Sequence, residues 1–134
     1  MSKLRIIKID RLFLYLWKMS DKYHFEISYK DLKVLFEDNH LIIINKPSGV
    51  LVQPDKQKGD TSLEDLTKEY VRVKYNKPGE VFLGVVHRLD RPTTGIVVFA
   101  RTSKALTRLN DLFKNRETQK TYWAVVKNKP SQNE

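Results

Sequence analysis

Between Gly84 and Ala100 the sequence reads GVVHRLDRPTTGIVVFA, and the rest of the chain is organised around this stretch. Two apolar runs flank a charged centre, and the centre ends in Thr-Thr-Gly, which suits a tight turn. The second run, Gly95–Ala100, is apolar on both faces, a pattern typical of a central strand in a sheet. We therefore expect the charged centre to form a loop at the end of a central strand.

The charged centre holds one carboxylate, Asp90, between Arg88 and Arg91. Nearby guanidinium groups favour the ionised form of a carboxylate, so Asp90 is a candidate nucleophile or base in surroundings that attract anions. A cluster of surface ion pairs at a strand end is an equally good interpretation, because structural ion pairs perturb carboxylates as readily as catalytic ones do. These three residues alone do not choose between the two interpretations.

The chain has 134 residues, which fits a single domain with room for a hydrophobic core. Its formal net charge of +9 favours a polyanionic partner, such as nucleic acid or an anionic membrane surface, although a solvated basic surface has the same composition.

The chain contains no cysteine, which excludes disulfides, thiolate catalysis and cysteine-ligated metals. His24, His40 and His87 lack the spacing of metal ligands, and the apolar runs are far shorter than a membrane span.

Candidate strands and helices are mixed along the chain. Leu41–Ile44 is β-branched and apolar, as expected of a buried strand, and Asp38 with Asn39 can turn it back on the preceding strand as a hairpin. We expect strands at Lys33–Asp38, Leu41–Ile44, Val50–Val52, Gly95–Ala100 and Lys120–Val126, and helices that begin after Thr61 or Ser62 and after Thr102 or Ser103. This mixture predicts an α+β domain.

Three further segments have open interpretations. Asn45–Gly49 interrupts the chain with a proline and a glycine, and Lys46 within it is either a phosphate-facing lysine or a solvated turn lysine. Gln53–Asp60 is polar and is interpreted as a mobile loop. Residues 1–32 form a lead segment that is either disordered or amphipathic, and Met19 is a second plausible start of the protein.

Three stretches of the chain, in order, resemble one known family. His87–Gly95 reads HRLDRPTTG and is similar to the HRLDRxTSG signature of the RluA-type pseudouridine synthases, with Thr94 where serine is usual. Glu37–Gly49 resembles the strand and turn that precede this signature, and Lys120–Val125 resembles the K-x-Y-x-A segment of the family. The resemblance implies a mixed, mainly antiparallel sheet with packed helices, in which residues 33–134 are part of a pseudouridine synthase catalytic domain.

The resemblance also implies roles for individual residues. Asp90 matches the catalytic aspartate of the family, and Tyr122 matches the tyrosine that packs on the target base and is implicated in proton transfer. Arg88 matches the arginine that enters the RNA helix where the target uridine leaves, and Arg91 and His87 are expected to bind RNA with it. The implied protein is a cytoplasmic, monomeric enzyme that isomerises uridine to pseudouridine in structured ribosomal or transfer RNA. It is expected to need no metal or other cofactor and to bind no membrane.

The residue types suit this chemistry. A base inside an RNA stem has to be flipped out at a cost of a few kcal/mol, and the planar guanidinium of Arg88 can stack in the space that it leaves. Asp90 can then attack the anomeric carbon or take a proton from the sugar, and the sequence supports either role. A single carboxylate argues against an ordinary glycoside hydrolase, which uses a pair. Without the resemblance, Tyr122 is better interpreted as a strand tyrosine in a core.

One part of the family pattern is not found in this sequence. Family members continue well beyond the K-x-Y-x-A segment, with further strands and a segment whose basic residue pairs with the catalytic aspartate. We therefore expect a truncated synthase of marginal stability, with weak or no activity on its own. The alternatives are a non-catalytic RNA-binding remnant of such an enzyme and a product that does not fold stably.

Overall fold

The computed structural model describes residues 3–8, 27–55 and 59–128 of the chain. Its contacts divide the chain into two compact units. The larger unit is Phe25–Asn115, and the smaller unit combines Met1–His24 with Arg116–Glu134. The larger unit contains His87–Asp90, which we call the HRLD segment, whereas the K-x-Y-x-A segment lies in the smaller unit.

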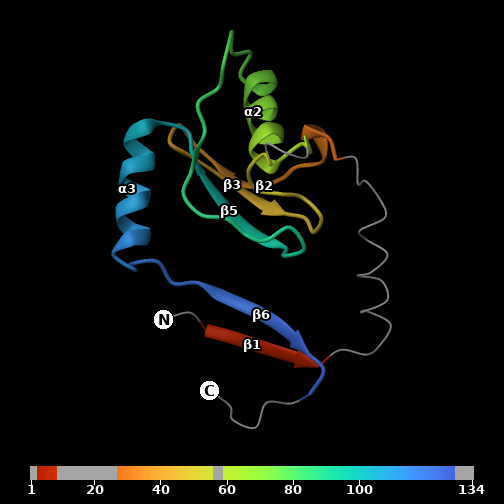
Figure 1. Cartoon of the computed structure of the whole chain (residues 1–134). Helices are drawn as coiled ribbons and strands as arrows, with labels where there is room; N and C mark the ends of the chain where they lie inside the picture. The colour runs from red at the N-terminus through yellow and green to blue at the C-terminus, as the bar shows by residue number, and fades with distance from the viewer. Residues whose placement is uncertain (1–2, 9–26, 56–58, 129–134) are drawn as a thin grey trace. The chain divides into compact units, whose positions relative to one another are not determined.

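A four-stranded antiparallel sheet forms the framework of the larger unit (Figure 1). Its strands are, in spatial order, β2 (Lys33–Glu37), β3 (Leu41–Lys46), β5 (Gly95–Ala100) and β4 (Gly84–Val85). β2 and β3 form the predicted hairpin. In its turn, Oδ1 of Asp38 accepts hydrogen bonds of 2.7 Å from the backbone N–H groups of His40 and Leu41, which is the turn chemistry that aspartate favours.

β5 lies between β3 and β4, which confirms the prediction of a central strand. Val97 and Phe99 are fully buried on the face of the sheet that packs against helix α2 (Leu63–Lys74). Ile96 points to the other face of the sheet and is 58% exposed, although the strand is apolar on both faces.

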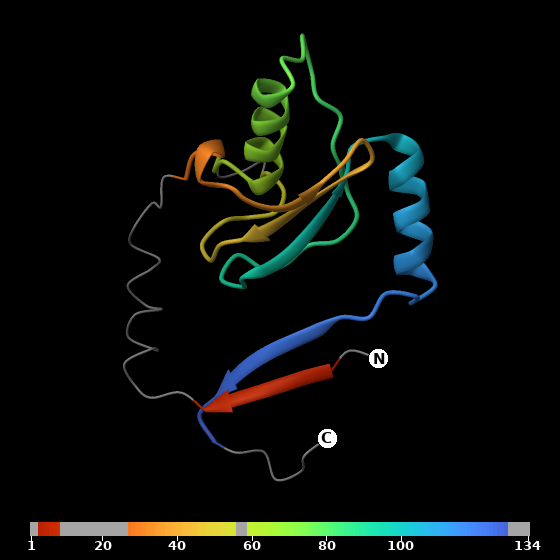
Figure 2. The same ribbon diagram turned by 180° about the vertical axis from the view of Figure 1, so that it is seen from behind.

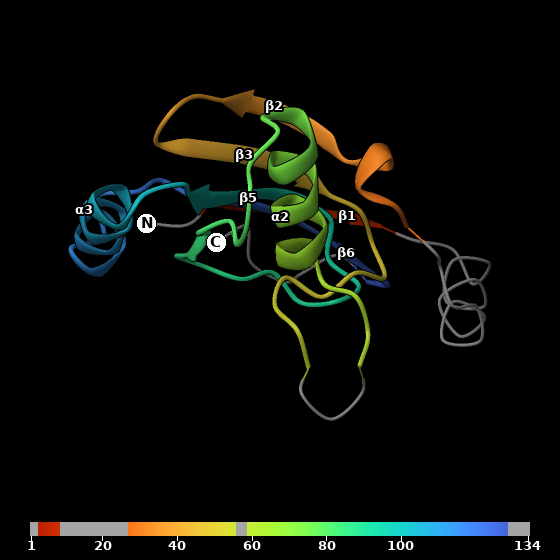
Figure 3. The same cartoon turned by 90° about the horizontal axis from the view of Figure 1, so that it is seen from above.

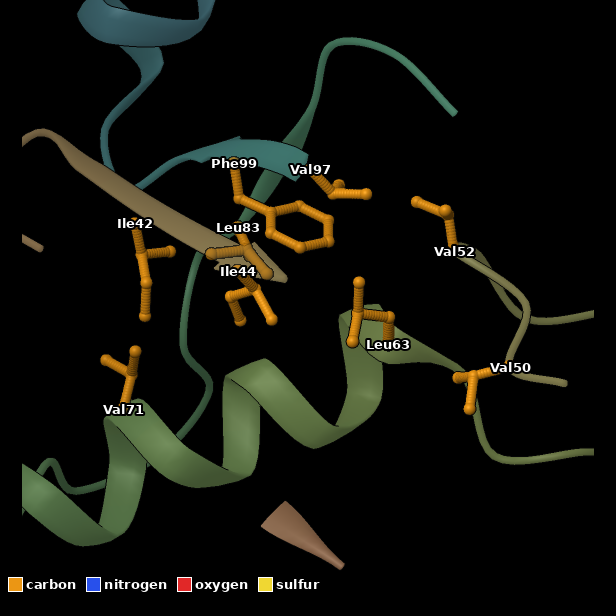
Figure 4. Packing of buried hydrophobic residues seen from close by; sticks show 9 residues of the cluster. All are labelled: Ile42, Ile44, Val50, Val52, Leu63, Val71, Leu83, Val97 and Phe99. Atoms are coloured by element: carbon orange, nitrogen blue, oxygen red, sulfur yellow. The ribbon is translucent and has the colours of Figure 1, made fainter. Parts of the chain in front are cut away.

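The hydrophobic core of the larger unit lies between this sheet and α2 (Figure 4). Figure 4 shows Leu63 and Val71 of α2 pointing toward the side chains of the sheet. The buried cluster consists of Ile42, Ile44, Val50, Val52, Leu63, Val71, Leu83, Val97 and Phe99. Removing these apolar side chains from water is the main favourable term that holds the helix on the sheet.

α2 begins at a capping box, and Ser62 is its N-cap. Oγ of Ser62 accepts a hydrogen bond of 3.2 Å from the backbone N–H of Asp65, and Oδ2 of Asp65 accepts one of 3.0 Å from the backbone N–H of Ser62. This arrangement confirms the predicted helix start and satisfies N–H groups that have no partner inside the helix. The short 3-10 helix η1 (Tyr29–Asp31) lies beside α2 (Figure 2).

Val50–Val52 corrects one expectation, because this segment is not a strand. The carbonyl oxygens of Leu51 and Val52 accept hydrogen bonds of 2.8 and 3.0 Å from the backbone N–H groups of Leu63 and Glu64. These N–H groups belong to the first turn of α2, where no carbonyl of the helix can reach them. The segment therefore uses its carbonyl groups at the start of the helix instead of in a sheet.

α3 (Ser103–Lys114) follows β5 and begins at Thr102, whose Oγ1 accepts a hydrogen bond of 3.1 Å from the backbone N–H of Ala105. The helix contacts β5 and β4 (Figure 3). Its approach to β4 is close, since a Cβ atom added at Gly84 would lie 2.8 Å from Cδ1 of Leu106. The absence of a side chain at Gly84 therefore permits the packing of α3 beside the sheet.

The smaller unit contains a two-stranded parallel sheet formed by β1 (Lys3–Lys8) and β6 (Thr121–Val126). β6 confirms the strand predicted at Lys120–Val126. β1 falls in the lead segment, of which residues 1–2 and 9–26 lie outside the described residues. The four-stranded antiparallel sheet and the two helices confirm the predicted α+β class, and the parallel pairing is found in the separate two-stranded sheet. Within the described part of the chain, no helix has the length and apolar character needed to span a membrane.

Candidate active site

Two loops of the larger unit line an open groove of about 1090 Å³. One loop follows the turn after β3, and the other contains the HRLD segment. The lining residues are Leu51, Val52, Gln53, Pro54, Asp55, Arg88, Leu89, Asp90 and Arg91. Arg88, Asp90 and Arg91, which the sequence predicts as site residues, therefore lie together in the wall of this groove.

Asp90 begins a turn centred on Arg91 and Pro92, which lies just before the Thr93–Gly95 sequence where a tight turn is expected. Its carbonyl oxygen accepts a hydrogen bond of 3.0 Å from the backbone N–H of Thr93, which closes a four-residue turn. Gly95 follows with a φ of +138°, a backbone conformation that L side chains rarely adopt, and the chain then enters β5. The turn thus leads from Asp90, in the groove wall, to the start of the central strand.

Arg91 is bound to the loops that precede α2. Its Nη2 forms an ion pair of 2.5 Å with Oδ2 of Asp60, and its Nε donates a hydrogen bond of 3.0 Å to the carbonyl oxygen of Gly49. The structure shows no ion pair between Asp90 and either Arg88 or Arg91. The interpretation of these three residues as one ion-pair cluster is therefore wrong, because the carboxylate that Arg91 meets is that of Asp60.

Lys46 corrects another expectation, because its side chain is fully buried and neither solvated nor open to a phosphate. Its Nζ donates hydrogen bonds of 3.0, 2.7 and 3.0 Å to the carbonyl oxygens of Pro47, Val50 and Arg91. Burial, which is the largest cause, and the positive charge of Arg91 both lower the pKa of Lys46, while the negative charge of Asp90 raises it, and the net result is a pKa of about 8. The turn after β3 therefore closes around a buried cation.

Two residues that shape this groove are not evident from the motifs. The sequence places Asp60 in a polar loop and gives no local sign that it pairs with Arg91, which is 31 positions away. Lys46 does have a local signal. Side chains alternate along a strand, so Lys46 lies on the same buried face as Ile42 and Ile44.

Of the remaining predicted site residues, His87 does not line the groove, and Tyr122 belongs to the smaller unit. Nε2 of His87 accepts a hydrogen bond of 3.0 Å from the backbone N–H of Val98 in β5, and its ring stacks on that of Phe113 in α3. Tyr122 lies on β6 in the smaller unit, opposite Leu4 in the register, and is 37% exposed. The role of Tyr122 at a target base stays a prediction.

Comparison with known proteins identifies the class to which this chain belongs. Residues 40–134 match the model of the family described as RNA pseudouridylate synthase. This match covers more than half of the chain, so the chain belongs to the RNA pseudouridylate synthase family. Its relatives include ribosomal large subunit pseudouridine synthases C and D, which confirms the resemblance to the RluA-type branch.

Two relatives and one solved structure illustrate the similarity. An uncharacterized RNA pseudouridine synthase of Mycoplasma genitalium is 33% identical over 114 residues, which are 84% of this chain and 35% of the relative. Ribosomal large subunit pseudouridine synthase C of Pasteurella multocida is 36% identical over 117 residues, which are 82% of this chain and 34% of the relative. The structure of human RNA Pseudouridylate Synthase Domain Containing 4 matches with a TM-score of 0.56 at 26% identity, over 76% of this chain and 35% of the human chain. The chain thus spans about a third of the length of these relatives.

Proposed function

We propose that this chain carries the site for isomerising uridine to pseudouridine in RNA, with Asp90 as the catalytic residue. The observation that supports this most is that Asp90 and Arg88 line one open groove in a member of this family. The groove volume of about 1090 Å³ is slightly larger than the range of about 300–1,000 Å³ for small-molecule sites, so a flipped-out nucleotide has room to enter it.

The reaction breaks the N1–C1′ bond of the uridine, turns the base over and joins C5 to C1′, after which C5 loses its proton and N1 carries one in the product. Asp90 acts at the sugar, either as a nucleophile on C1′ or as a base that removes a proton from the sugar. Both routes need a carboxylate that is fixed beside the flipped-out nucleotide. The hydrogen bond from Lys46 to the carbonyl oxygen of Arg91 fixes the backbone next to Asp90. The isomerisation involves no net oxidation or reduction and needs no metal or other cofactor.

In the proposed function, positively charged and planar side chains bind the RNA. Arg88 fills the gap that the flipped base leaves in the RNA stack, because a guanidinium stacks on bases. Arg91 adds positive charge to the groove wall, and Tyr122 packs on the target base. The formal net charge of +9 favours RNA in general, and the substrate is a structured ribosomal or transfer RNA. The protein acts as a monomer in the cytoplasm.

The chain spans about a third of the length of its relatives, so a test of activity has to include the rest of a family member. We propose that the 134 residues alone have weak or no activity. The test therefore uses the chain and also a chimera in which it replaces the matching residues of the Pasteurella multocida relative. Tritium release from C5-labelled uridine in RNA measures turnover. We expect turnover by the chimera, its loss in Asp90→Asn, and no change in Asp111→Asn, an exposed carboxylate on α3.

Two outcomes of this assay would contradict the proposal. An Asp90→Asn chimera that releases tritium at the unchanged rate would show that Asp90 is not catalytic. Release by the chain alone at the rate of the full-length relative would show that the 134 residues are sufficient. If the chimera binds RNA in a strongly salt-dependent manner but forms no pseudouridine, the chain is a non-catalytic RNA-binding remnant, which its basic charge alone also favours.

A further inference from the structure

The pairing between β4 and β5 stops just before the HRLD segment. In the antiparallel register Val85 lies opposite Phe99, and β4 ends at Val85. One more step of the same register would bring Val86 opposite Val98. Because the strand has ended, the backbone N–H of Val98 takes its hydrogen-bond acceptor from a side chain and not from a strand residue of β4.

His87 supplies this acceptor. Its Nε2 accepts a hydrogen bond of 3.0 Å from the backbone N–H of Val98. An imidazole nitrogen accepts a hydrogen bond only when it carries no proton, so the geometry requires a neutral ring with its proton on Nδ1. The imidazole therefore takes the place that a backbone carbonyl of β4 would fill in a longer strand.

The ring of His87 is also held from α3. It stacks on the ring of Phe113 with the centroids 5.0 Å apart and an angle of 20° between the planes. This separation lies in the range in which aromatic rings attract one another. One edge of the imidazole thus faces the central strand and one face lies against the last turn of α3, so both elements fix the orientation of the ring.

We propose that His87 is a positioning residue for Asp90 and not an RNA contact. It ends the pairing of β4 with β5 and ties the start of the HRLD segment to the central strand. The other side of the segment is tied at Arg91, whose carbonyl oxygen accepts the hydrogen bond from Lys46. The short stretch Arg88–Asp90 is therefore held on both sides. A neutral ring also offers no positive charge to an RNA phosphate.

The proposal that His87 positions Asp90 for catalysis rests on the proposed function. The protonation state of the His87 ring can be tested independently of that function. Long-range ¹H–¹⁵N spectra of the histidine rings in the whole chain test that state at neutral pH. We expect a protonated Nδ1 and an unprotonated Nε2 for His87, with a coupling through the hydrogen bond between Nε2 and the amide nitrogen of Val98. A proton on Nε2, or a fully protonated ring, would overturn the inference.

Two substitutions of His87 then separate positioning from RNA contact. His87→Gln keeps an acceptor at a similar reach, whereas His87→Leu removes it, and His40→Leu is the control at an exposed histidine. We expect His87→Leu to shift the amide resonances of Arg88–Asp90 in the RNA-free chain, and His87→Gln and His40→Leu to leave them near their wild-type positions. In His87→Leu, affinity for a uridine-containing stem-loop RNA should stay within about twofold of wild type, because no phosphate contact is lost.

Turnover by the chimera gives the last readout. We expect His87→Leu to lower kcat by about 100-fold with little change in KM, since a displacement of about 1 Å costs that much, and His87→Gln to restore most of it. A loss of RNA affinity in His87→Leu with the amides of Arg88–Asp90 unmoved would identify an RNA contact and overturn the inference. If the ring state and the amide shifts are as expected but the wild-type chimera releases no tritium, the proposed function fails and the placement of His87 stands.

Discussion

The ammonium group of Lys46 donates a hydrogen bond of 3.0 Å to the carbonyl oxygen of Arg91, although the two residues are 45 positions apart in the sequence. The same Nζ donates one of 2.7 Å to the carbonyl oxygen of Val50. Gly49 adds two links to Arg91, through its N–H and its carbonyl group. One buried cation and one glycine therefore join the two loops that line the groove.

We predict that Nζ of Lys46 titrates at a pKa of about 8, below the ordinary value of 10.5, because the side chain is buried. Between these values the unfolded chain binds more protons than the folded chain, so the contribution of Lys46 to stability grows as the pH rises and is lost as the pH falls through 8. ¹⁵N spectra of the lysine side chains measure the pKa directly.

The same shift predicts a pH-dependent effect of Lys46→Met. The free energy of unfolding of the wild type relative to this variant should rise by up to about 3 kcal/mol between pH 8 and 10.5, as urea titrations can measure. Lys33→Met, at an exposed position of β2, is the control and should show no such trend. A difference that stays flat over this range would contradict the buried state of Lys46.

The ion pair between Arg91 and Asp60 should contribute modestly to stability. Because the two side chains are 42% and 22% exposed, solvent screens the pair. A double-mutant cycle with Arg91→Gln and Asp60→Asn, read by urea unfolding, should give a coupling free energy of about 0.5–1 kcal/mol at low salt and less at high salt. No coupling at low salt would show that the two loops are not held by this pair.

The start of α2 gives a prediction with a matched control. Ser62→Ala should lower the free energy of unfolding by about 1 kcal/mol, because it removes the N-cap of the helix. Thr61→Ala, at the exposed neighbour that the sequence leaves equally open as a cap, should change it by less than about 0.5 kcal/mol. Thermal or urea unfolding measures both, and equal losses would place the cap elsewhere.

The close packing of α3 on β4 predicts coupling between Gly84 and Leu106. Gly84→Ala should destabilise the chain by about 1–3 kcal/mol, because the new Cβ would lie 2.8 Å from Cδ1 of Leu106. In the double variant with Leu106→Ala, the total loss should be smaller than the sum of the two single losses, since the clash is gone. Additive losses in urea unfolding would contradict the contact.

The elements that could be predicted from the sequence are those that depend on residues close together in the chain. The hairpin around Asp38, the capped start at Ser62 and the central strand Gly95–Ala100 follow from turn chemistry, capping and apolar runs. Each of these signals acts over a few positions of the chain. The motif also draws attention to Arg88 and Asp90, which lie together in the groove because they are two residues apart.

The contacts that build the groove could not be predicted in the same way. The ion-pair partner of Arg91 depends on how distant loops meet in space. Proximity in the sequence therefore wrongly suggests Asp90 as this partner, and no local pattern points to Asp60. Val50–Val52 has the composition of a strand, but the unpaired N–H groups at the start of α2 take its carbonyl groups. The burial of Lys46, in contrast, can be predicted from the sequence, because strand alternation places this residue on the buried face.

The most direct test of the central claim is to map where RNA binds on the chain. A uridine-containing stem-loop RNA is added to the ¹⁵N-labelled chain, and the shifts of the backbone amides are recorded. We predict the largest shifts in the two loops that line the groove, Leu51–Asp55 and Arg88–Arg91, with weaker binding in Arg88→Leu. Shifts confined to α3, with both groove loops unchanged, would contradict the assignment of this groove as the site of the target uridine.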